Sequence, residues 1–559
     1  MHLPQINLLI ILALGLHSFA FAQSPPAASP LNQPVPRPKL VVGIAVDQMR
    51  WDYLQRFRGH FGEGGFKRML SEGFTCDSTF INHLPSATAV GHACVFTGSV
   101  PAINGITGND WRDQLTGKTV YCVADDTVST VGGQSEDEGK MSPRNMLVTT
   151  VTDELRLATN FRSKVVGVSV KDRAAILPAG HSATAAYWFE DLSGRFITST
   201  FYMPEAPQWL TDFNAKEVGA ELVKDDWHLA LPPEKYTQSS ADDVPWEGKS
   251  GSEKAPVFPH LIASPYKLKK DTILTTPFGN TLTLRMAQAA VEGHALGQGP
   301  DTDFLTINCA STDYVGHKYG PNSLETEDVY VRLDRDLAAF FTFLDEKLGK
   351  GSYLVFLTAD HGVAHSVGFM NEHRMPAGDF NQTDMVKLLN EMLQKMTGIE
   401  KAVLGVDNYM VSFDLKKIEE AGADFERMKA ASITLLQRQP GVLFALDASR
   451  AGEATVPEPI KTMVVNGYNS QRCGSVQIIP RSGWMRIGKT GSTHAAWNPY
   501  DTHIPLLFMG WGIKHGTSAR VVHMQDIAPT VSSLLSIQMP SGNIGKPILE
   551  VLGQPPPAP

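Results

Sequence analysis

The sequence predicts an α/β fold in which helices flank a mostly parallel central sheet, and three observations support this. The chain has 559 residues, of which 42% are hydrophobic, so it can bury a large core. Several apolar runs of strand length lie far apart along the chain, and segments of helical periodicity separate them. Strands buried on both faces of a parallel sheet are unbroken apolar runs of this kind.

The predicted elements can be placed in chain order. The runs that predict strands are residues 40–46, 164–170, 304–308, 353–358 and 504–509. Residues 328–348 predict a long helix, because their apolar side chains recur at helical spacing. Residues 89–96, directly after Thr88, predict a shorter helix.

The first 22 residues predict a secretory signal peptide. Residues 8–16 are apolar, and Ala20-Phe21-Ala22 forms a cleavage pattern before Gln23. No Lys or Arg precedes the apolar run, which departs from the usual pattern. Residues 23–38 predict a Pro-rich linker. The alternative to a signal peptide is a buried N-terminal helix, which fits poorly with the Pro-rich residues that follow. We therefore expect a periplasmic or secreted protein with no membrane insertion after signal cleavage.

Composition excludes several classes of protein. The net charge of −9 argues against a nucleic-acid partner, because such proteins usually carry a basic stripe. It leaves an anionic substrate open, since a site can be locally positive. Glycine-rich stretches lack a P-loop or dinucleotide pattern, so no nucleotide cofactor is expected. An odd number of cysteines leaves at least one free thiol, and we expect most of the five to be small buried hydrophobes: Cys76, Cys94, Cys122, Cys309 and Cys473.

Acidic residues follow three of the predicted strands. Asp47 comes directly after the first, Asp313 and His317 follow the third, and Asp360 and His361 follow the fourth. Open α/β sheets bind ligands at the carboxyl ends of their strands. A lone Asp in such a place is more often a helix N-cap. Three together, two of them with histidines, indicate one crevice.

These residue types suit a metal. Asp313 and His317 are four residues apart, so on a helix they share one face. His494, just before the strand predicted at 504–509, is a further candidate, although taken alone it would more often be structural. Three carboxylates and three imidazoles suit zinc and are enough for two ions. The candidate ligands are Asp47, Asp313, His317, Asp360, His361 and His494.

The order of short motifs resembles a known family. The motifs are residues 46–49 (VDQM), 84–92 (LPSATAVGH), 97–98 (TG), 108–110 (GND), 171–173 (KDR), 311–317 (STDYVGH) and 359–362 (ADHG). Together they resemble the alkaline phosphatase superfamily, and within it the periplasmic, phosphate-irrepressible alkaline phosphatases of the flavobacterial type. The likeness runs from about residue 39 to residue 547. Each motif is weak alone, whereas their order and spacing are specific.

The resemblance implies roles for the matched residues. It makes Thr88 the nucleophile that attacks phosphorus, with two Zn²⁺ per chain. It assigns Asp313, His317 and His494 to the first ion. It assigns Asp47, Asp360, His361 and the Thr88 hydroxyl to the second. Coordination to zinc can activate a hydroxyl that is otherwise a poor nucleophile. The alternative for Thr88 is an ordinary helix N-cap.

Two cations predict the substrate class. Lys171 and Arg173 follow a predicted strand at a spacing of two, so in extended backbone they face the same way. Two cations on one face of a cleft need an anion to offset their desolvation, and a phosphate monoester carries one charge more than a diester. The resemblance gives Lys171, Arg173 and Asn109 a phosphate-binding role that marks the monoesterase branch. In a sequence without these motifs, a solvated turn would be the favoured interpretation.

The sequence therefore predicts a zinc-dependent phosphate monoester hydrolase of the alkaline phosphatase type. It would act through a covalent phospho-threonine, release inorganic phosphate and work as a monomer on small phosphate monoesters. A phosphodiesterase or nucleotide pyrophosphatase of the same superfamily is the alternative, and it should lack the Lys171/Arg173 pair. A sulfatase would need a Cys-x-Pro/Ala-x-Arg motif, which the chain lacks. A phosphoglycerate mutase would be cytosolic, and a non-catalytic binding protein would not need Thr88. We expect supporting or structural roles for His92, His365 and His373.

One alkaline phosphatase-like domain is predicted over residues 39–550, ending in a Pro-rich tail at 551–559. Two long stretches, near 175–300 and 370–490, contain no matched metal ligand. We interpret them as insertions that build a discontinuous cap over the cleft.

Overall fold

The computed structural model describes residues 36–251, 253–486, 488 and 490–555. The predicted signal peptide and most of the predicted linker lie outside the described residues. Within the described part of the chain, no helix is both long and apolar enough to cross a membrane.

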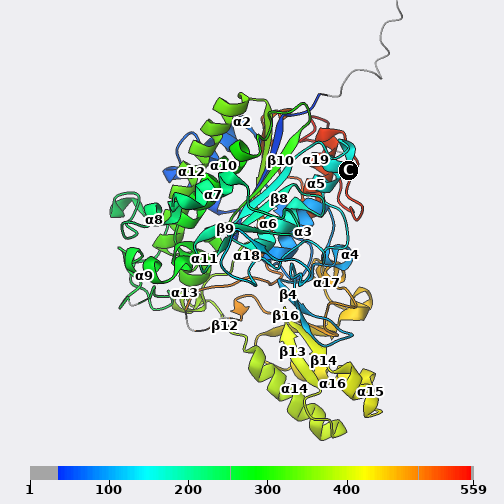
Figure 1. The fold of residues 1–559 in the computed structure, drawn as a ribbon. Helices are drawn as coiled ribbons and strands as arrows, with labels where there is room; N and C mark the ends of the chain where they lie inside the picture. The colour runs from blue at the N-terminus through cyan, green and yellow to red at the C-terminus, as the bar shows by residue number, and fades with distance from the viewer. Residues whose placement is uncertain (1–35, 252, 487, 489, 556–559) are drawn as a thin grey trace, which may run out of the picture. The chain divides into compact units, whose positions relative to one another are not determined.

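The predicted α/β fold is confirmed (Figure 1). Its central sheet has ten strands, and the strands in the middle of the sheet run parallel. From one edge to the other its strands are β20 (Gly516–Ser518), β2 (Phe74–Cys76), β19 (Leu506–Gly510), β11 (Tyr353–Thr358), β1 (Leu40–Val46), β10 (Asp303–Cys309), β7 (Val165–Ser169), β8 (Ala185–Glu190), β9 (Arg195–Ser199) and β6 (Thr130–Val131). β11, β1, β10, β7 and β8 run parallel. Towards the edges, β19 and β9 pair antiparallel with their inner neighbours.

The three central strands end level with one another. Ala45 near the end of β1 pairs with Asn308 of β10 on one side and with Thr358 of β11 on the other. All residues of these strands are buried, as unbroken apolar runs require. The segments that follow the three strands therefore leave the sheet at one edge, which is where an open α/β sheet binds its ligands.

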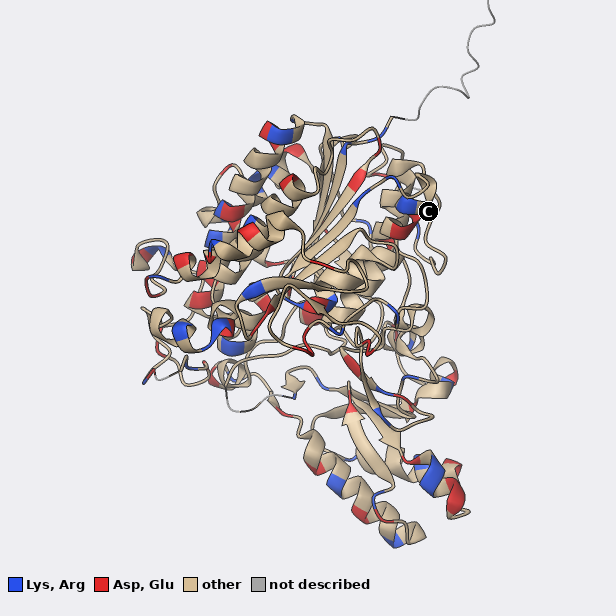
Figure 2. Cartoon of the chain, in the orientation of Figure 1, with Lys and Arg blue, Asp and Glu red and all other residues tan. Residues whose placement is uncertain are grey.

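Helices cover both faces of the sheet (Figure 1). One layer contains α3 (Thr88–Thr97), α5 (Val151–Ala158), α6 (Asp172–Ala179) and α19 (Ile527–Leu535). The other contains α2 (Phe66–Glu72), α10 (Phe278–Gly293), α11 (Ser311–Tyr319) and α12 (Leu324–Leu348). Figure 2 shows that charged residues of both signs lie mainly on helices and loops, whereas the central strands carry few.

The strand predicted at 504–509 is divided by Pro505. β18 (His503–Ile504) pairs with β3 (Thr79–Phe80) in a three-stranded sheet completed by β21 (Val522–His523). β19 begins after the proline and joins the central sheet. Proline has no N–H for a sheet ladder, which accounts for the break.

The two stretches predicted as insertions differ in structure. Within residues 175–300, β8 and β9 belong to the central sheet and α10 packs on β10, so both ends of this stretch join the central layers. Between them lie α7 (Gln208–Ala215), α8 (Val218–Leu222) and α9 (Ala263–Leu268). Within residues 370–490, a separate four-stranded sheet has its own hydrophobic core. Its strands are β13 (Val403–Asp407), β14 (Met410–Phe413), β16 (Val476–Pro480) and β15 (Val442–Asp447), with α14 (Gln382–Thr397), α15 (Leu415–Glu420) and α16 (Phe425–Leu436). That these stretches form a cap stays a prediction.

Several shorter helices and strand pairs also belong to the described chain. The helices are α1 (Tyr53–Arg56), α4 (Pro101–Asn104), α13 (Val367–Glu372), α17 (Ile460–Gly467) and α18 (Pro499–Thr502). The strand pairs are β4 (Asp110–Arg112) with β5 (Thr119–Tyr121), and β12 (Gly378–Asp379) with β17 (Trp484–Met485). All five cysteines are buried and unpaired, so the prediction that they are small buried hydrophobes is confirmed.

Candidate active site

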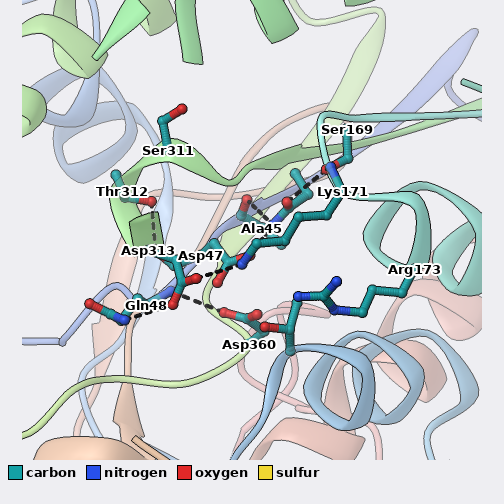
Figure 3. A network of polar contacts seen from close by, with 12 residues as sticks. Ala45, Asp47, Gln48, Ser169, Lys171, Arg173, Ser311, Thr312, Asp313 and Asp360 are labelled. Carbon is teal, nitrogen blue, oxygen red and sulfur yellow. Dashed lines mark hydrogen bonds and ion pairs between the residues drawn. The ribbon is translucent and has the colours of Figure 1, made fainter. Parts of the chain in front are cut away.

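Three carboxylates meet where the central strands end (Figure 3). Asp47 directly follows β1, Asp360 follows β11 after one intervening residue, and Asp313 lies in the first turn of α11. Asp47 and Asp360 are 0% exposed and Asp313 is 3% exposed. The level ends of the strands bring together three acids that are far apart in the sequence.

The helix α11 presents Asp313 and His317 on one face, as their spacing predicts. His317 Nε2 lies 3.2 Å from Asp313 Oδ1. His494, from the loop before α18, places its Nε2 3.7 Å from the same oxygen. The potential ligand atoms of Asp313, His317 and His494 lie within 4.8 Å of one another.

A second group of potential ligands adjoins the first. One ligand atom each from Asp47, Asp313 and His361 also lies within 4.8 Å of the others, so Asp313 belongs to both groups. Asp360 Oδ2 lies 3.4 Å from His361 Nε2. The structure thus brings all six predicted ligands together, with Asp313 shared between the two groups.

Thr88 is the first residue of α3, and its hydroxyl lies at the second group. Thr88 Oγ1 is 3.4 Å from His361 Nε2, and the residue is 1% exposed. Ala87, rather than Thr88, is the N-cap residue of the helix. The alternative interpretation of Thr88 as an ordinary N-cap is therefore wrong, because the cap position is one residue earlier.

His317, His361 and His494 each form the same kind of hydrogen bond through Nδ1. The Nδ1 atoms contact backbone carbonyl oxygens at 2.8 Å for His317 and Ser492, 2.9 Å for His361 and Gly362, and 2.7 Å for His494 and Ser86. A carbonyl only accepts hydrogen bonds, so each Nδ1 carries the proton and each Nε2 keeps a lone pair. Every one of these Nε2 atoms lies beside a carboxylate. This arrangement is typical of histidines that bind a metal through Nε2.

The donor atoms fit a bound cation. Asp47 Oδ1 and Asp360 Oδ2 are buried and have no hydrogen-bond partner. Burying an unpartnered carboxylate oxygen is costly, and a divalent cation would satisfy it. Carboxylate oxygens combined with imidazole nitrogens suit zinc.

Protonation equilibria in the cluster are strongly perturbed. Burial, followed by the charge of Asp47, raises the pKa of Asp360 well above its usual range. Burial, followed by repulsion from His361 and His317, lowers the pKa of His494 well below its usual range. Such shifts concentrate at functional sites.

Lys171 penetrates the carboxylate cluster. It is the N-cap residue of α6, and its Nζ lies 2.9 Å from Asp47 Oδ2 and 2.6 Å from Asp313 Oδ2 (Figure 3). Burial by itself would lower the pKa of the ammonium, but Asp313 and then Asp47 outweigh it and raise that pKa. The ammonium is therefore held in its charged form by carboxylates of both groups.

The backbone expected for Arg173 is wrong. α6 begins at Asp172, whose Oδ1 accepts a hydrogen bond from Arg173 N at 2.6 Å, so Arg173 lies in a helical turn rather than in extended backbone. Lys171 alone keeps extended dihedral angles. Both side chains nevertheless extend toward the carboxylates (Figure 3). Arg173 Nη1 lies 3.2 Å from Tyr121 Oη, while its Nε is buried without a hydrogen-bond partner.

Asn109 lies next to Thr88. Its Oδ1 accepts a hydrogen bond from Ala89 N at 2.9 Å, at the N-terminus of α3. The side-chain NH₂ group of an amide held through its oxygen is available to a further acceptor. Asn109, from the loop before β4, and Lys171 and Arg173, from the start of α6, therefore supply hydrogen-bond donors from two segments around the cluster.

Sequence reasoning missed the polar residues that contact the predicted ligands. Gln48 Nε2 donates a hydrogen bond to Asp313 Oδ1 at 2.6 Å, and Asn308 Nδ2 lies 3.4 Å from Asp47 Oδ2. Their position in the sequence could have indicated them, because both are polar residues at the end of an apolar strand.

The other histidines near the motifs differ in their surroundings. His92 Nδ1 lies 2.8 Å from Thr88 O and 3.4 Å from Asp360 Oδ2. His365 Nδ1 contacts Asn322 Oδ1 at 2.7 Å, and His373 is exposed. Of the three, His92 is the one in contact with the cluster.

The sequence is similar to known proteins over nearly the whole chain. The family model of type I phosphodiesterase / nucleotide pyrophosphatase matches residues 41–503. The chain is 56% identical over 522 residues to the alkaline phosphatase PafA of Elizabethkingia meningoseptica, covering 93% of this chain and 95% of that protein. It is 50% identical over 556 residues to the alkaline phosphatase PhoV of Synechococcus elongatus, covering 98% and 100%.

The fold agrees as well. A crystal structure of wild-type PafA matches with a TM-score of 0.92 at 56% identity, covering 93% of this chain and 100% of that one. The chain therefore belongs to the type I phosphodiesterase / nucleotide pyrophosphatase family, within the alkaline phosphatase superfamily.

Proposed function

We propose that this chain is a zinc-dependent phosphate monoester hydrolase of the alkaline phosphatase type. It acts through a covalent phosphate ester on Thr88 and releases inorganic phosphate. The observation that carries the proposal is the position of the Thr88 hydroxyl, which lies beside His361 in a buried cluster that also contains Lys171. The identity to PafA and PhoV, both named alkaline phosphatases, supports it.

Zinc would be held by two overlapping sets of residues. Asp313, His317 and His494 would hold the first ion, and Asp47, Asp360, His361 and Thr88 Oγ1 the second. Bound zinc supplies a Lewis acid that lowers the pKa of a coordinated hydroxyl and stabilises charge on phosphoryl oxygens. The Nδ1 hydrogen bonds of the three histidines to backbone carbonyls support this, because they leave each Nε2 free to bind.

The protein's own residues position and stabilise the phosphoryl group. Thr88 Oγ1 loses its proton and attacks phosphorus while the P–O bond to the ester oxygen breaks, and the leaving group departs as the alcohol after taking up a proton. Water then attacks the phosphorus of the phospho-threonine, the P–Oγ1 bond breaks, and inorganic phosphate and the Thr88 hydroxyl are formed. The N–H groups at the start of α3, a helix of ten residues, favour an anion at Thr88. Burial of the surrounding side chains keeps bulk water away and strengthens these interactions.

Lys171, Arg173 and Asn109 would bind the non-bridging phosphate oxygens. Lys171 pairs with Asp47 and Asp313. Zinc at these carboxylates would take over their negative charge, so the ammonium could pair with phosphate instead. Two cations suit the dianionic monoester better than the monoanionic diester.

A phosphodiesterase or nucleotide pyrophosphatase remains the second candidate, because the matching family model carries that description. The deciding experiment compares kcat/KM for an aryl phosphate monoester with that for the matching diester, with zinc quantified by mass spectrometry on the same sample. We expect the monoester to be strongly preferred. Preference for the diester would establish the second candidate.

We also propose that the protein is exported and acts as a monomer on small phosphate monoesters. The apolar run at residues 8–16 and the A-x-A pattern at 20–22 support export. Mass spectrometry of protein recovered from the periplasm or medium should find Gln23 as the first residue. Light scattering of the same material tests the monomer.

A further inference from the structure

Gln48 has a backbone conformation that few side chains adopt. It follows Asp47 at the end of β1, is 2% exposed and has a φ of +64°. A non-glycine residue in this left-handed region is uncommon, because its Cβ lies too close to the following carbonyl oxygen. Such strain persists where the surrounding structure requires it, and it concentrates at functional sites.

This conformation directs two donors of one residue to two carboxylates. Gln48 N donates to Asp360 Oδ1 at 3.1 Å, and Gln48 Nε2 donates to Asp313 Oδ1 at 2.6 Å. Figure 3 shows Gln48 beside Asp313. The peptide between Asp47 and Gln48 is itself held, because Thr312 Oγ1 donates to Asp47 O at 2.6 Å. Gln48 therefore connects a carboxylate from each of the two proposed zinc sites.

The hydrogen bonds leave particular oxygens available. Asp360 Oδ1 accepts from both Gln48 N and His361 N, whereas Asp360 Oδ2 is buried without a partner. Asp313 Oδ1 accepts from Gln48 and is also the oxygen nearest His317 and His494. An oxygen with two lone pairs can accept one hydrogen bond and still bind a cation.

Helix α11 makes room for the amide. A Cβ added at Gly316 would lie 1.8 Å from Gln48 Oε1, so no other residue at position 316 would leave the amide in place. Glycine inside a helix is destabilising relative to alanine, because it loses more conformational freedom on folding. Gly316 lies between Asp313 and His317, and its small size lets the Gln48 amide reach the carboxylate.

We infer that Gln48 is a positioning residue that orients the carboxylates of Asp313 and Asp360, and thereby sets the zinc affinity of both sites together. The inference rests on the proposed zinc chemistry. It predicts that disturbing the Gln48 amide weakens metal binding even though Gln48 is not a ligand. Partners that orient metal ligands typically contribute about 10–100-fold in metal affinity.

Two variants displace the amide in independent ways. Gly316→Ala pushes the amide away from Asp313, changes no charge and improves helix propensity. Gln48→Gly removes the amide, keeps the backbone N–H that donates to Asp360, and relieves the left-handed strain. Gly452→Ala is the control, because a Cβ there meets nothing within 4 Å. The double variant tests whether the two changes act on the same contact.

The measurements are zinc dissociation constants from competition with a chromogenic chelator and the visible spectrum of the Co²⁺-substituted protein. We expect both single variants to bind zinc about 10–100-fold more weakly and to shift the Co²⁺ bands. The double variant should be no worse than the worse single variant, and the control should match the wild type. The melting temperature of metal-stripped Gly316→Ala should not fall, which separates positioning from folding.

Two results would overturn the inference, and they are distinguishable. If the wild type binds zinc and both variants match it in affinity and spectrum, Gln48 has no positioning role. If the wild type binds no zinc, the proposed function fails and the inference fails with it.

Discussion

Lys171 Nζ lies 2.6 Å from Asp313 Oδ2, and the lysine side chain is only 2% exposed. Asp313 is also the carboxylate common to both groups of potential metal ligands. A buried ion pair is costly to form, so its presence at a ligand shared by two sites indicates a role beyond stability. Metal binding and phosphate binding should therefore be linked through Lys171 and Asp313.

Replacing the cations should change the preference among substrates. Lys171→Met and Arg173→Met keep an aliphatic stem but lose the charge. Each should lower monoester kcat/KM by about 10²–10³, because the contact stabilises charge in the transition state. Diester hydrolysis should fall much less, so the ratio of the two kcat/KM values should collapse. Arg195→Met, at an exposed position of β9, is the control and should change neither.

Equal losses on both substrates would contradict this prediction. Lys171 and Arg173 would then have a structural role, and phosphodiesterase activity would become the favoured function.

Thr88→Ala should abolish the covalent step and lower activity by several orders of magnitude, because no other hydroxyl is proposed to receive the phosphate. Thr88→Ser should retain much of the activity, since it keeps the hydroxyl at the first residue of α3. Acid quenching during turnover, followed by peptide mass spectrometry, should find phosphate on Thr88. Phosphate on a different residue of the wild type would show that Thr88 is wrongly assigned.

Purified protein should contain about two zinc ions per chain, and chelation should abolish activity. Removing zinc leaves Asp47 Oδ1 and Asp360 Oδ2 buried without a partner, so the melting temperature should also fall. Elemental mass spectrometry and differential scanning calorimetry measure the two effects. Full activity in protein shown to be free of zinc would contradict the metal assignment.

His260 should make stability depend on pH. Burial alone would lower its pKa, but Glu253, at 3.2 Å, and Glu325, at 2.8 Å, outweigh burial and raise the pKa to about 9. The folded-state pKa then exceeds the unfolded value of about 6.5. The stabilisation is complete below about pH 6.5 and is lost as the pH rises through about 9.

His260→Gln should therefore flatten the fall in the free energy of unfolding between about pH 6.5 and 9. Chemical denaturation across this range measures it. A variant whose stability falls as steeply as that of the wild type would refute the ion pair.

Glu247→Gln should stabilise the protein at alkaline pH. Both carboxylate oxygens are buried without a partner, and burial, followed by repulsion from Glu325, raises the pKa of Glu247 to about 10. Because the folded-state pKa exceeds the unfolded value, the carboxyl costs more stability as the pH rises above about 4.5. The melting temperature of the amide variant should exceed that of the wild type at pH 9 and not at pH 4. A variant less stable than the wild type at pH 9 would contradict this.

The sequence by itself determined the central strands and most of the cluster. The runs at 40–46 and 353–358 match β1 and β11 residue for residue, because unbroken apolar runs bury both faces. The spacing of Asp313 and His317 predicted one helix face, which α11 provides. These properties depend on neighbours within a few residues, so a local pattern contains them.

Only the tertiary structure decided how the cluster is held. Gln48 reaches Asp313 and Asp360, which are 265 and 312 residues away in the sequence. Lys171 reaches two carboxylates at once, at separations of 124 and 142 residues. The start of α6 put Arg173 in a helical turn, against the expected extended backbone. The proton on each histidine Nδ1 depends on a carbonyl brought in from elsewhere for His317 and His494. Such contacts form only when the strands align, and no local pattern records which side chains will then face one another.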